Sequence, residues 1–397
     1  MRRMKVHKFT YHNVGQGLFF EGRFQFEDQE ITIVYDCGAE KSYKSNLNSV
    51  ISKFQISNNH IDILVVSHFD FDHISGIRQL LSQCTVSHII LPYLTNEDIL
   101  IYLLTQRNAS PQEESWYTEF LKNPYIILSG FESIKKITFI VNEDEFEKSI
   151  WLESLDITNG NMENEAIHTI YKQVEIDFKN SRDVHEVNAN LKLKFYNYAI
   201  SSQKEQAFKT KIKEEMRNRG DSSVHSLALR VLSNSKETEE FKTNYRYVSK
   251  SNHNNVSLLM MYDFKITRGE ILKVAFQEEQ LKLFNNAPQY YPLSNFRFVH
   301  FFTGDISLKY VKKHLQIYEH YKDLLPHVDA IQVPHHGSKN NWNDDLLKLI
   351  PKKTIFIVSS GIHNQFGHPH TEVVDSIEAN HKMFKANETE SIYVEIL

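Results

Sequence analysis

Four side chains that can bind a divalent cation lie within six residues of this chain. They are His68, Asp70, Asp72 and His73. The apolar, β-branched run 61–67 before them predicts a buried strand, so the four side chains should lie on the loop where that strand ends. Alternate residues of extended backbone share a side, so His68 and Asp70 can converge on one ion while Asp72 and His73 turn toward a second. The spacing predicts half of a two-metal site.

The stretch 68–73, followed by Ile74-Ser75-Gly76, resembles the metal motif of the metallo-β-lactamase fold, in the variant where the usual second His is Asp. Six further segments resemble the same family, in its order along the chain. They are Asn13-Val-Gly15-Gln-Gly17, Val34-Tyr-Asp36-Cys-Gly38, Asn254-Asn255-Val-Ser257-Leu258-Leu259, Thr303-Gly304-Asp305, Val333-Pro-His335-His336-Gly337-Ser338 and Ser360-Gly361-x-x-Asn364-x-x-Gly367-His368-Pro369. The set is most similar to the soluble hydrolase domain of ComEC-type competence DNA-uptake proteins.

This resemblance implies an α/β fold, a metallo-β-lactamase-like αββα sandwich that spans residues 1–397 as a single domain. It leaves the middle of the chain unexplained. In residues 94–187 the alternation of short helices and strands gives way to longer amphipathic pieces mixed with weak strands. We therefore expect an inserted subdomain of mixed helix and strand at 94–187.

Later strand ends should supply the remaining metal ligands. Two cations about 3.5–4 Å apart need a carboxylate that bridges them, and Asp305 arrives alone after its own predicted strand. The resemblance assigns the bridge to Asp305 as well. The predicted metal ligands are then His68, Asp70, Asp72, His73, Asp305, His335 and His336. One ion would take the first two of these residues, and the other ion the next two with one of the adjacent histidines.

The mixture of imidazole and carboxylate groups, without cysteine, suits two divalent ions of zinc or manganese. The absence of a second His from the motif favours manganese slightly. A water bound to such ions can fall in pKa from about 15.7 to about 7, so a hydroxide becomes available as the nucleophile at neutral pH.

Four residues form the predicted catalytic set, namely Asp72, His335, His336 and His368. Because His335 and His336 are adjacent, only one should bind metal well, and the other should hydrogen-bond a substrate oxygen. The sequence does not choose between them. His368 could protonate the leaving oxygen or hydrogen-bond the phosphate, and a purely structural turn histidine is the alternative. Asp36 should orient a ligand loop rather than bind metal.

Composition limits the class of protein. A net charge of −5, with 24% charged and 41% hydrophobic residues, is an ordinary globular balance with no overall cationic character for binding nucleic acid. The two cysteines are too few for a disulfide framework, which fits a reducing compartment. No run approaches the 18 or so apolar residues of a membrane span, so we expect a cytoplasmic protein with no membrane contact.

The sequence therefore predicts a binuclear metallohydrolase that cleaves phosphodiesters, with nucleic acid, DNA or RNA, as its substrate. The nucleic-acid part is an analogy with the relatives that the motifs resemble. One alternative is a phosphodiesterase for a small nucleotide or a phosphocholine-type ester. A second alternative is a metal-stabilised interaction module that recruits a protein partner through the acidic insertion.

Overall fold

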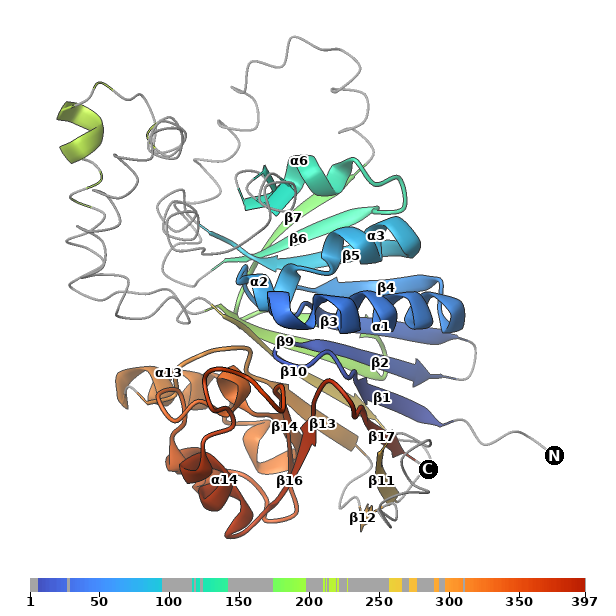
Figure 1. Ribbon diagram of the computed structural model, residues 1–397, viewed down its shortest axis with the longest axis vertical. Coiled ribbons are helices and arrows are strands. Elements are labelled where there is room, and N and C mark those ends of the chain that lie inside the picture. Colours follow the sequence, from blue (N-terminus) through green and yellow to red (C-terminus); the bar gives the residue numbers. More distant parts are fainter. Residues whose placement is uncertain are drawn as a thin grey trace.

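The computed structural model (Figure 1) describes residues 6–26, 29–94, 116–117, 119–121, 124–141, 174–197, 210, 212, 214–218, 220, 227, 257–265, 271–276, 289–292, 297–309 and 311–396. Within these residues the chain forms two β-sheets with helices on their outer faces. None of the helices described has the length and apolar character needed to cross a lipid bilayer.

Ten strands of the described chain form the first sheet. In spatial order they are β12 (Gln289–Pro292), β11 (Ile271–Phe276), β17 (Ile392–Ile396), β1 (His7–Tyr11), β2 (Phe19–Gln25), β3 (Glu30–Cys37), β4 (His60–Val65), β5 (Thr85–Pro92), β6 (Lys136–Val141) and β7 (Glu175–Asn180). From β3 to β7 neighbouring strands run parallel, and the pairs from β12 to β3 are antiparallel.

The second sheet has seven strands within the described residues. Their order is β16 (Lys382–Ala386), β15 (Ile355–Ser359), β14 (Val328–Gln332), β13 (Arg297–Phe302), β10 (Leu258–Lys265), β9 (Leu191–Asn197) and β8 (Val184–Asn188). The strands β13 to β16 are parallel, so each polar loop after one of them begins at the same sheet edge.

An apolar core fills the space between the two sheets, and it is rich in aromatic rings. Alternate residues of a strand share one face, so Phe9 and Tyr11 of β1 both point inward, and Phe9 stacks on Phe298 of the opposite sheet with centroids 5.4 Å apart. Two further apolar clusters lie outside the sheets. One is covered by α1 (Lys44–Ser57), α3 (Ile77–Gln83) and α6 (Pro124–Ser129), the other by α13 (Val311–Tyr321) and α14 (Thr371–Glu378). The layers follow the αββα order that the resemblance to the metallo-β-lactamase fold implies (Figure 1).

The described parts of 94–187 differ from the predicted insertion. β6 and β7 extend the first sheet beyond β5, in parallel, and β8 pairs with β9 in the second sheet. These strands are parts of the sandwich, and because residues 95–115 and 142–173 lie outside the described residues, an insertion there stays a prediction. β6 and β7 pair with strands that are distant in sequence, so a local pattern does not assign them to the sheet, whereas β8 forms a hairpin with β9 directly after it. The amphipathic piece 98–104 lies outside the described residues.

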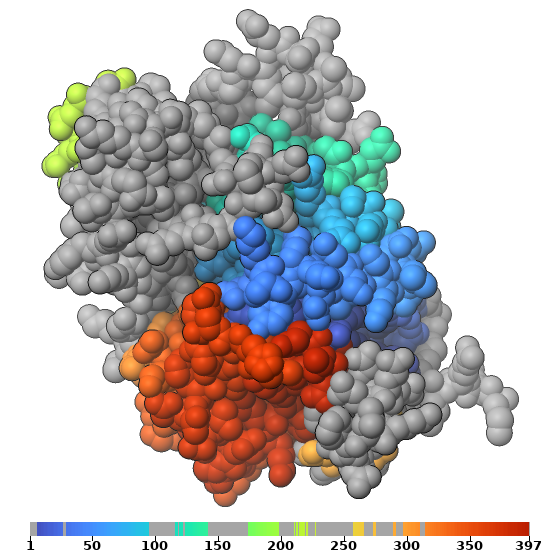
Figure 2. All heavy atoms as spheres, in the orientation of Figure 1, coloured from blue at the N-terminus to red at the C-terminus, as the bar shows by residue number. Residues whose placement is uncertain are grey.

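The N-terminal and C-terminal parts of the chain lie against each other. β1 pairs antiparallel with β17, from His7 opposite Ile396 to Tyr11 opposite Ile392. Figure 2 shows the blue N-terminal residues directly against the orange and red C-terminal ones on one face of the molecule. This arrangement brings the loops after β4, β13 and β14 together.

Candidate metal centre

Each predicted ligand follows a strand of the inner sheets or begins a short helix beside one. His68 follows β4, and Asp70 precedes α2 (Phe71–Ile74), which carries Asp72 and His73. Asp305 follows β13, whereas His335 and His336 lie in the short turn η4 (Pro334–Gly337) after β14. β4 belongs to the first sheet and β13 and β14 to the second, and the loops after these strands bring polar side chains from three distant segments to one place.

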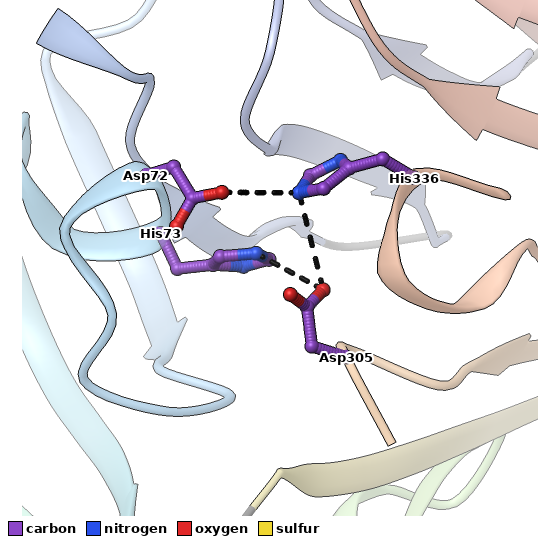
Figure 3. Close-up of side chains that lie close together, drawn as sticks. All are labelled: Asp72, His73, Asp305 and His336. Carbon is purple, nitrogen blue, oxygen red and sulfur yellow. Dashed lines mark hydrogen bonds and ion pairs between the residues drawn. The ribbon is translucent and has the colours of Figure 1, made fainter. Parts of the chain in front are cut away.

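The side chains gather into two groups that have one residue in common. In the first group, potential ligand atoms of Asp72, His73, Asp305 and His336 lie within 4.8 Å of one another, and Figure 3 shows these side chains pointing toward a common centre. In the second group, His68, Asp70 and Asp305 meet the same limit. The grouping is the one predicted for two ions, with Asp305 shared.

The two oxygens of Asp305 face different groups. Its Oδ1 lies 3.2 Å from Nε2 of His73 and 4.0 Å from Nε2 of His336. Its Oδ2 lies 3.8 Å from Nε2 of His68, which is itself 3.5 Å from Oδ2 of Asp70. A carboxylate with one oxygen toward each group has the geometry of a bridging ligand.

Each of three buried histidines, His68, His73 and His336, is oriented by a hydrogen bond at its Nδ1 atom. Nδ1 of His73 donates to Asp36 at 2.8 Å, and Nδ1 of His336 donates to the carbonyl oxygen of Ser359 at 2.7 Å. The Ser67 hydroxyl donates to Asp36 at 2.6 Å, so it accepts from Nδ1 of His68 at 2.8 Å. With Nδ1 of each ring engaged in this way, Nε2 is the atom that faces the carboxylates.

This arrangement fits a metal centre. Nε2 of His68, Nε2 of His73 and Oδ1 of Asp305 are buried and have no hydrogen-bond partner. Although Nε2 of His73 is 3.2 Å from Asp305, the two atoms are not aligned as donor and acceptor. Buried lone pairs that face one another are unfavourable unless a proton or cation lies between them. Imidazole nitrogen and carboxylate oxygen are also the donors that zinc and manganese accept.

The close approach of these carboxylates and imidazoles shifts their pKa values. Burial alone would lower the pKa of His73, but the carboxylates of Asp305, Asp72 and Asp36 raise it well above its ordinary value. Burial likewise opposes the ionised form of Asp72, yet His73 and His336 lower the pKa of that carboxyl to about 2. Both carboxylates of the cluster stay ionised, because His335 and His73 also hold the pKa of Asp305 well below its usual range against burial. The cluster therefore attracts positive charge.

Unusual backbone geometry is concentrated at this site. Among the described residues, the non-glycine residues with positive φ are Asp36 (57°), His335 (45°) and His336 (53°). Such conformations cost free energy and persist where the surroundings enforce them. Gly304 also has positive φ, 51°, and a Cβ there would press on Ser257, whose hydroxyl accepts a hydrogen bond from the Asp305 amide at 3.0 Å. The turn before Asp305 thus requires glycine.

The structure separates His335 from His336. His336 belongs to the four-residue group, with Nε2 3.1 Å from Oδ2 of Asp72. His335 belongs to neither group, although its Nε2 is 3.7 Å from Oδ2 of Asp305, and its side chain is 26% exposed. Asp70 and Asp72, which belong to the two groups, have side chains that are 22% and 21% exposed. These three side chains mark the side from which the centre is accessible.

His368 lies beside both adjacent histidines. Its ring centroid is 5.5 Å from that of His335 and 6.4 Å from that of His336. Burial first, and then the neighbouring histidines, lower the pKa of His368 to about 3, so the ring is neutral at pH 7. Gln16 donates from Nε2 to Nδ1 of His368 at 3.4 Å, which leaves the proton of His368 on Nε2. His368 is thus suited to donate a hydrogen bond rather than to act as a charged acid.

Sequence reasoning missed three residues that position the site. Gln16 holds His368, Ser67 connects Asp36 to His68, and the Gln332 side chain accepts hydrogen bonds from the amides of Thr303 and Gly304 at 2.9 and 2.8 Å. Gln16 stands between two glycines of a quoted motif, and this position was a usable signal. Ser67 and Gln332 are ordinary polar ends of buried strands, and nothing local distinguishes them. Asn254 and Asn255 lie outside the described residues.

The comparisons with known proteins agree with the fold. Residues 26–152 match the family described as the metallo-beta-lactamase superfamily, and this segment contains the loop with His68 to His73. Members of that superfamily are metal-dependent hydrolases. No curated protein matches the chain. The narrower similarity to ComEC-type proteins stays a prediction.

Solved structures of low sequence identity resemble the chain. The metallo-beta-lactamase fold protein YhfI from Bacillus subtilis is 8% identical, with a TM-score of 0.36, and the match covers 96% of this chain and 98% of that one. A diphosphatase of the PhnP family is 11% identical over 99% and 100% of the two chains, with a TM-score of 0.35. A long form RNase Z from yeast is 10% identical over 97% and 41%, with a TM-score of 0.34. From the family match and the sandwich described above, we conclude that residues 26–152 match the metallo-beta-lactamase superfamily and that the chain adopts the metallo-beta-lactamase fold.

Proposed function

We propose that this protein is a binuclear metal-dependent phosphodiesterase, and that it acts as a nuclease on DNA or RNA. One observation carries the proposal: two ligand groups share the carboxylate of Asp305, one oxygen toward each group. A pair of sites with a common bridging carboxylate suits reactions in which attacking and leaving oxygens both need charge compensation, as in phosphodiester cleavage.

Two divalent cations, zinc or manganese, would be held by His68, Asp70 and Asp305 on one side and by Asp72, His73, Asp305 and His336 on the other. Bound there, they would supply a deprotonated water at neutral pH and offset the negative charge of the phosphate. Asp36 and Ser67 fix the rings of His73 and His68, so the ligand atoms are already in place before binding.

The residues on the accessible side have different tasks. His335 is partly exposed beside Asp305, and a hydrogen bond with the Asn341 side chain helps to hold it, so it can donate to a phosphate oxygen. His368, neutral at pH 7, donates a second hydrogen bond without adding a charge. Asp72 stays ionised and keeps His336 in place at 3.1 Å. These groups position the substrate and stabilise charge as it develops.

The nucleic-acid substrate rests on the resemblance of the motifs, because the net charge of −5 gives no overall cationic attraction. We place the protein in the cytoplasm, since Cys37 and Cys84 are free, buried thiols, as a reducing compartment allows. The alternatives remain a small phosphodiester substrate and a partner-binding role of residues 94–187.

The test is a substrate panel with zinc-loaded and manganese-loaded protein. Single-stranded DNA, duplex DNA, RNA, bis-p-nitrophenyl phosphate and p-nitrophenyl phosphorylcholine are assayed in parallel, with Asp305→Asn as the inactive variant. Asp329→Asn is the matched control, because Asp329 is a similarly buried carboxylate of β14 that pairs with Lys353 at 3.0 Å, away from the site. Cleavage of an oligonucleotide that Asp305→Asn abolishes and Asp329→Asn retains supports the proposal. Cleavage of none of the phosphodiesters refutes it.

A further inference from the structure

The loop 361–367, after β15, exposes two large apolar side chains next to the metal centre. Phe366 is 47% and Ile362 is 46% exposed. Large apolar side chains are exposed singly on most protein surfaces, so exposure alone indicates little. What distinguishes Phe366 is its position, since it lies two residues before His368.

A row of rings leads from Phe366 to the ligand cluster. Phe366 and His368 stack with centroids 5.6 Å apart and an angle of 26° between their planes. His368 in turn meets His335 edge to face at 5.5 Å, and Nε2 of His335 lies 3.7 Å from Oδ2 of Asp305. Phe366 is therefore connected through His368 to His335, the ring that lies beside the carboxylate shared by both metal groups.

The loop that carries Phe366 is fixed internally by one side chain. Nδ2 of Asn364 donates to the carbonyl oxygens of Gly361 and His368 at 2.7 and 2.6 Å. Oδ1 of Asn364 accepts from the amides of Phe366 and His368 at 3.1 and 2.9 Å. Four hydrogen bonds from a single amide group hold the backbone of Phe366 in one conformation.

The loop is also tied to the N-terminal part of the chain and to the turn before β17. The Gly361 amide donates to Oε1 of Gln16 at 3.3 Å, and the Ile362 amide donates to Oε2 of Glu388 at 2.8 Å. Tyr43 packs so closely on Gly361 that a Cβ at this glycine would collide with its hydroxyl. Fixing a contact surface before binding reduces the entropy that binding has to overcome. The exposed ring is thus held in a prepared position.

From this row of rings on a fixed loop, we infer that Phe366 is a stacking surface for a nucleobase attached to the scissile phosphodiester. The inference rests on the proposed function and narrows its substrate to single-stranded nucleic acid or a dinucleotide, in which a base is free to leave its neighbours. Base stacking on aromatic side chains is tolerant of sequence, because every base has a flat face. A choline headgroup is less well served, since quaternary ammonium groups are recognised by cages of several aromatic rings.

Two measurements test the inference. The first is the cleavage rate with a thymidine oligonucleotide, with the dinucleotide TpT and with an oligonucleotide whose residues are all abasic. The second is equilibrium binding of the fluorescein-labelled versions of the two oligonucleotides to metal-loaded protein. Both compare wild type with Phe366→Ala and Phe366→Trp. Ile56→Ala is the matched control, because Ile56 is an 84% exposed apolar residue on α1.

We expect Phe366→Ala to weaken binding of the thymidine oligonucleotide, and to raise its KM, by about 5-fold to 100-fold. The abasic chain should bind wild type and Phe366→Ala equally, Phe366→Trp should retain base-dependent binding, and Ile56→Ala should match wild type. If Phe366→Ala raises the KM for TpT as much as it raises the KM for the oligonucleotide, the substrate is a dinucleotide. If Phe366→Ala raises the KM for the oligonucleotide but leaves the KM for TpT unchanged, the substrate is a longer single strand.

The results separate the inference from the proposed function. If wild type cleaves no phosphodiester but binds the thymidine oligonucleotide through Phe366, the nuclease proposal fails and the stacking surface stands. If Phe366→Ala leaves the binding of the thymidine oligonucleotide unchanged, or weakens the abasic chain to the same degree, the stacking surface is refuted whatever the enzyme cleaves.

Discussion

The fully buried carboxylate of Asp36 lies 2.8 Å from Nδ1 of His73 and also accepts hydrogen bonds from the amide and the hydroxyl of Ser67, both at 2.6 Å. One side chain that does not face the metal groups thereby sets the direction of His73 directly and that of His68 through Ser67. These contacts also account for the positive φ of Asp36, 57°, because this backbone conformation turns the carboxylate toward both loops.

We predict that Asp36→Asn weakens metal binding by about 10-fold to 100-fold, because the amide group presents a donor where the hydroxyl of Ser67 and Nδ1 of His73 both need an acceptor. Titration with a competing chelator measures the change. Asp62→Asn is the control, since Asp62 accepts from the Thr32 amide at 2.7 Å on β4, the strand that leads to the site. Equal losses in both variants would show that Asp36 acts only through general stability.

Substitutions of the adjacent residues His335 and His336 should have different effects on metal content and on the rate of hydrolysis. His336→Ala removes a member of the four-residue group, so we expect less bound metal. His335→Ala should retain both ions and slow hydrolysis by about 10²–10³, the usual cost of losing one hydrogen bond to a developing charge. Elemental analysis and turnover of one phosphodiester, measured on the same samples, distinguish the two variants. Equal metal loss in both would contradict this division.

The two metal sites should differ in affinity. Within the described residues, one group offers four ligand side chains and the other three, with Asp305 counted in both. We expect two binding steps in calorimetry, the tighter one at the group with Asp72. Asp70→Asn should abolish the weaker step alone, whereas Asp72→Asn should weaken the tighter one. A single step of two identical sites in wild type would be incompatible with this assignment.

Chelation should reverse the dependence of stability on pH. The folded pKa values of His73 and His336 are raised, because nearby carboxylates outweigh burial. Their contribution to the metal-free protein is therefore complete below the ordinary value of 6.5 and is lost as pH rises through the raised values. For Asp72 the sign is opposite: its contribution is present above 3.8 and is lost as pH falls toward about 2.

Melting temperatures between about pH 5 and 9, with chelator and with excess manganese, test this expectation. The metal-free protein should lose stability toward alkaline pH, and the metal-loaded protein should gain it, because metal binding releases protons from the histidines. Parallel curves for the two samples would argue that these histidines do not bind the metal.

Much of the site could be predicted from the sequence, because its residue types and their place after predicted strands are local properties. The side chains of the motif from His68 to His73 lie together with Asp305, and Asp36 contacts His73, as the sequence predicts, while their roles as metal ligands stay predictions. The choice between His335 and His336 could not be predicted. It depends on two successive left-handed backbone conformations, which no preference of histidine indicates.

The strands β6 and β7 could not be assigned to the first sheet from the sequence for a related reason. β6 pairs with β5 across the stretch from 92 to 136 and with β7 across the stretch from 141 to 175. Strand pairing over long separations depends on neighbours that a local pattern does not contain. Their residues therefore looked like an insertion between two recognisable halves.

The separation of the ligands along the chain also determines when the centre can exist. Asp72 and His336 are 264 residues apart. During synthesis the loop with Asp72 leaves the ribosome long before Asp305 and His336, so a nascent chain contains neither complete group of ligands. The order of synthesis alone would then leave the proposed metal centre incomplete until nearly the whole sandwich has formed.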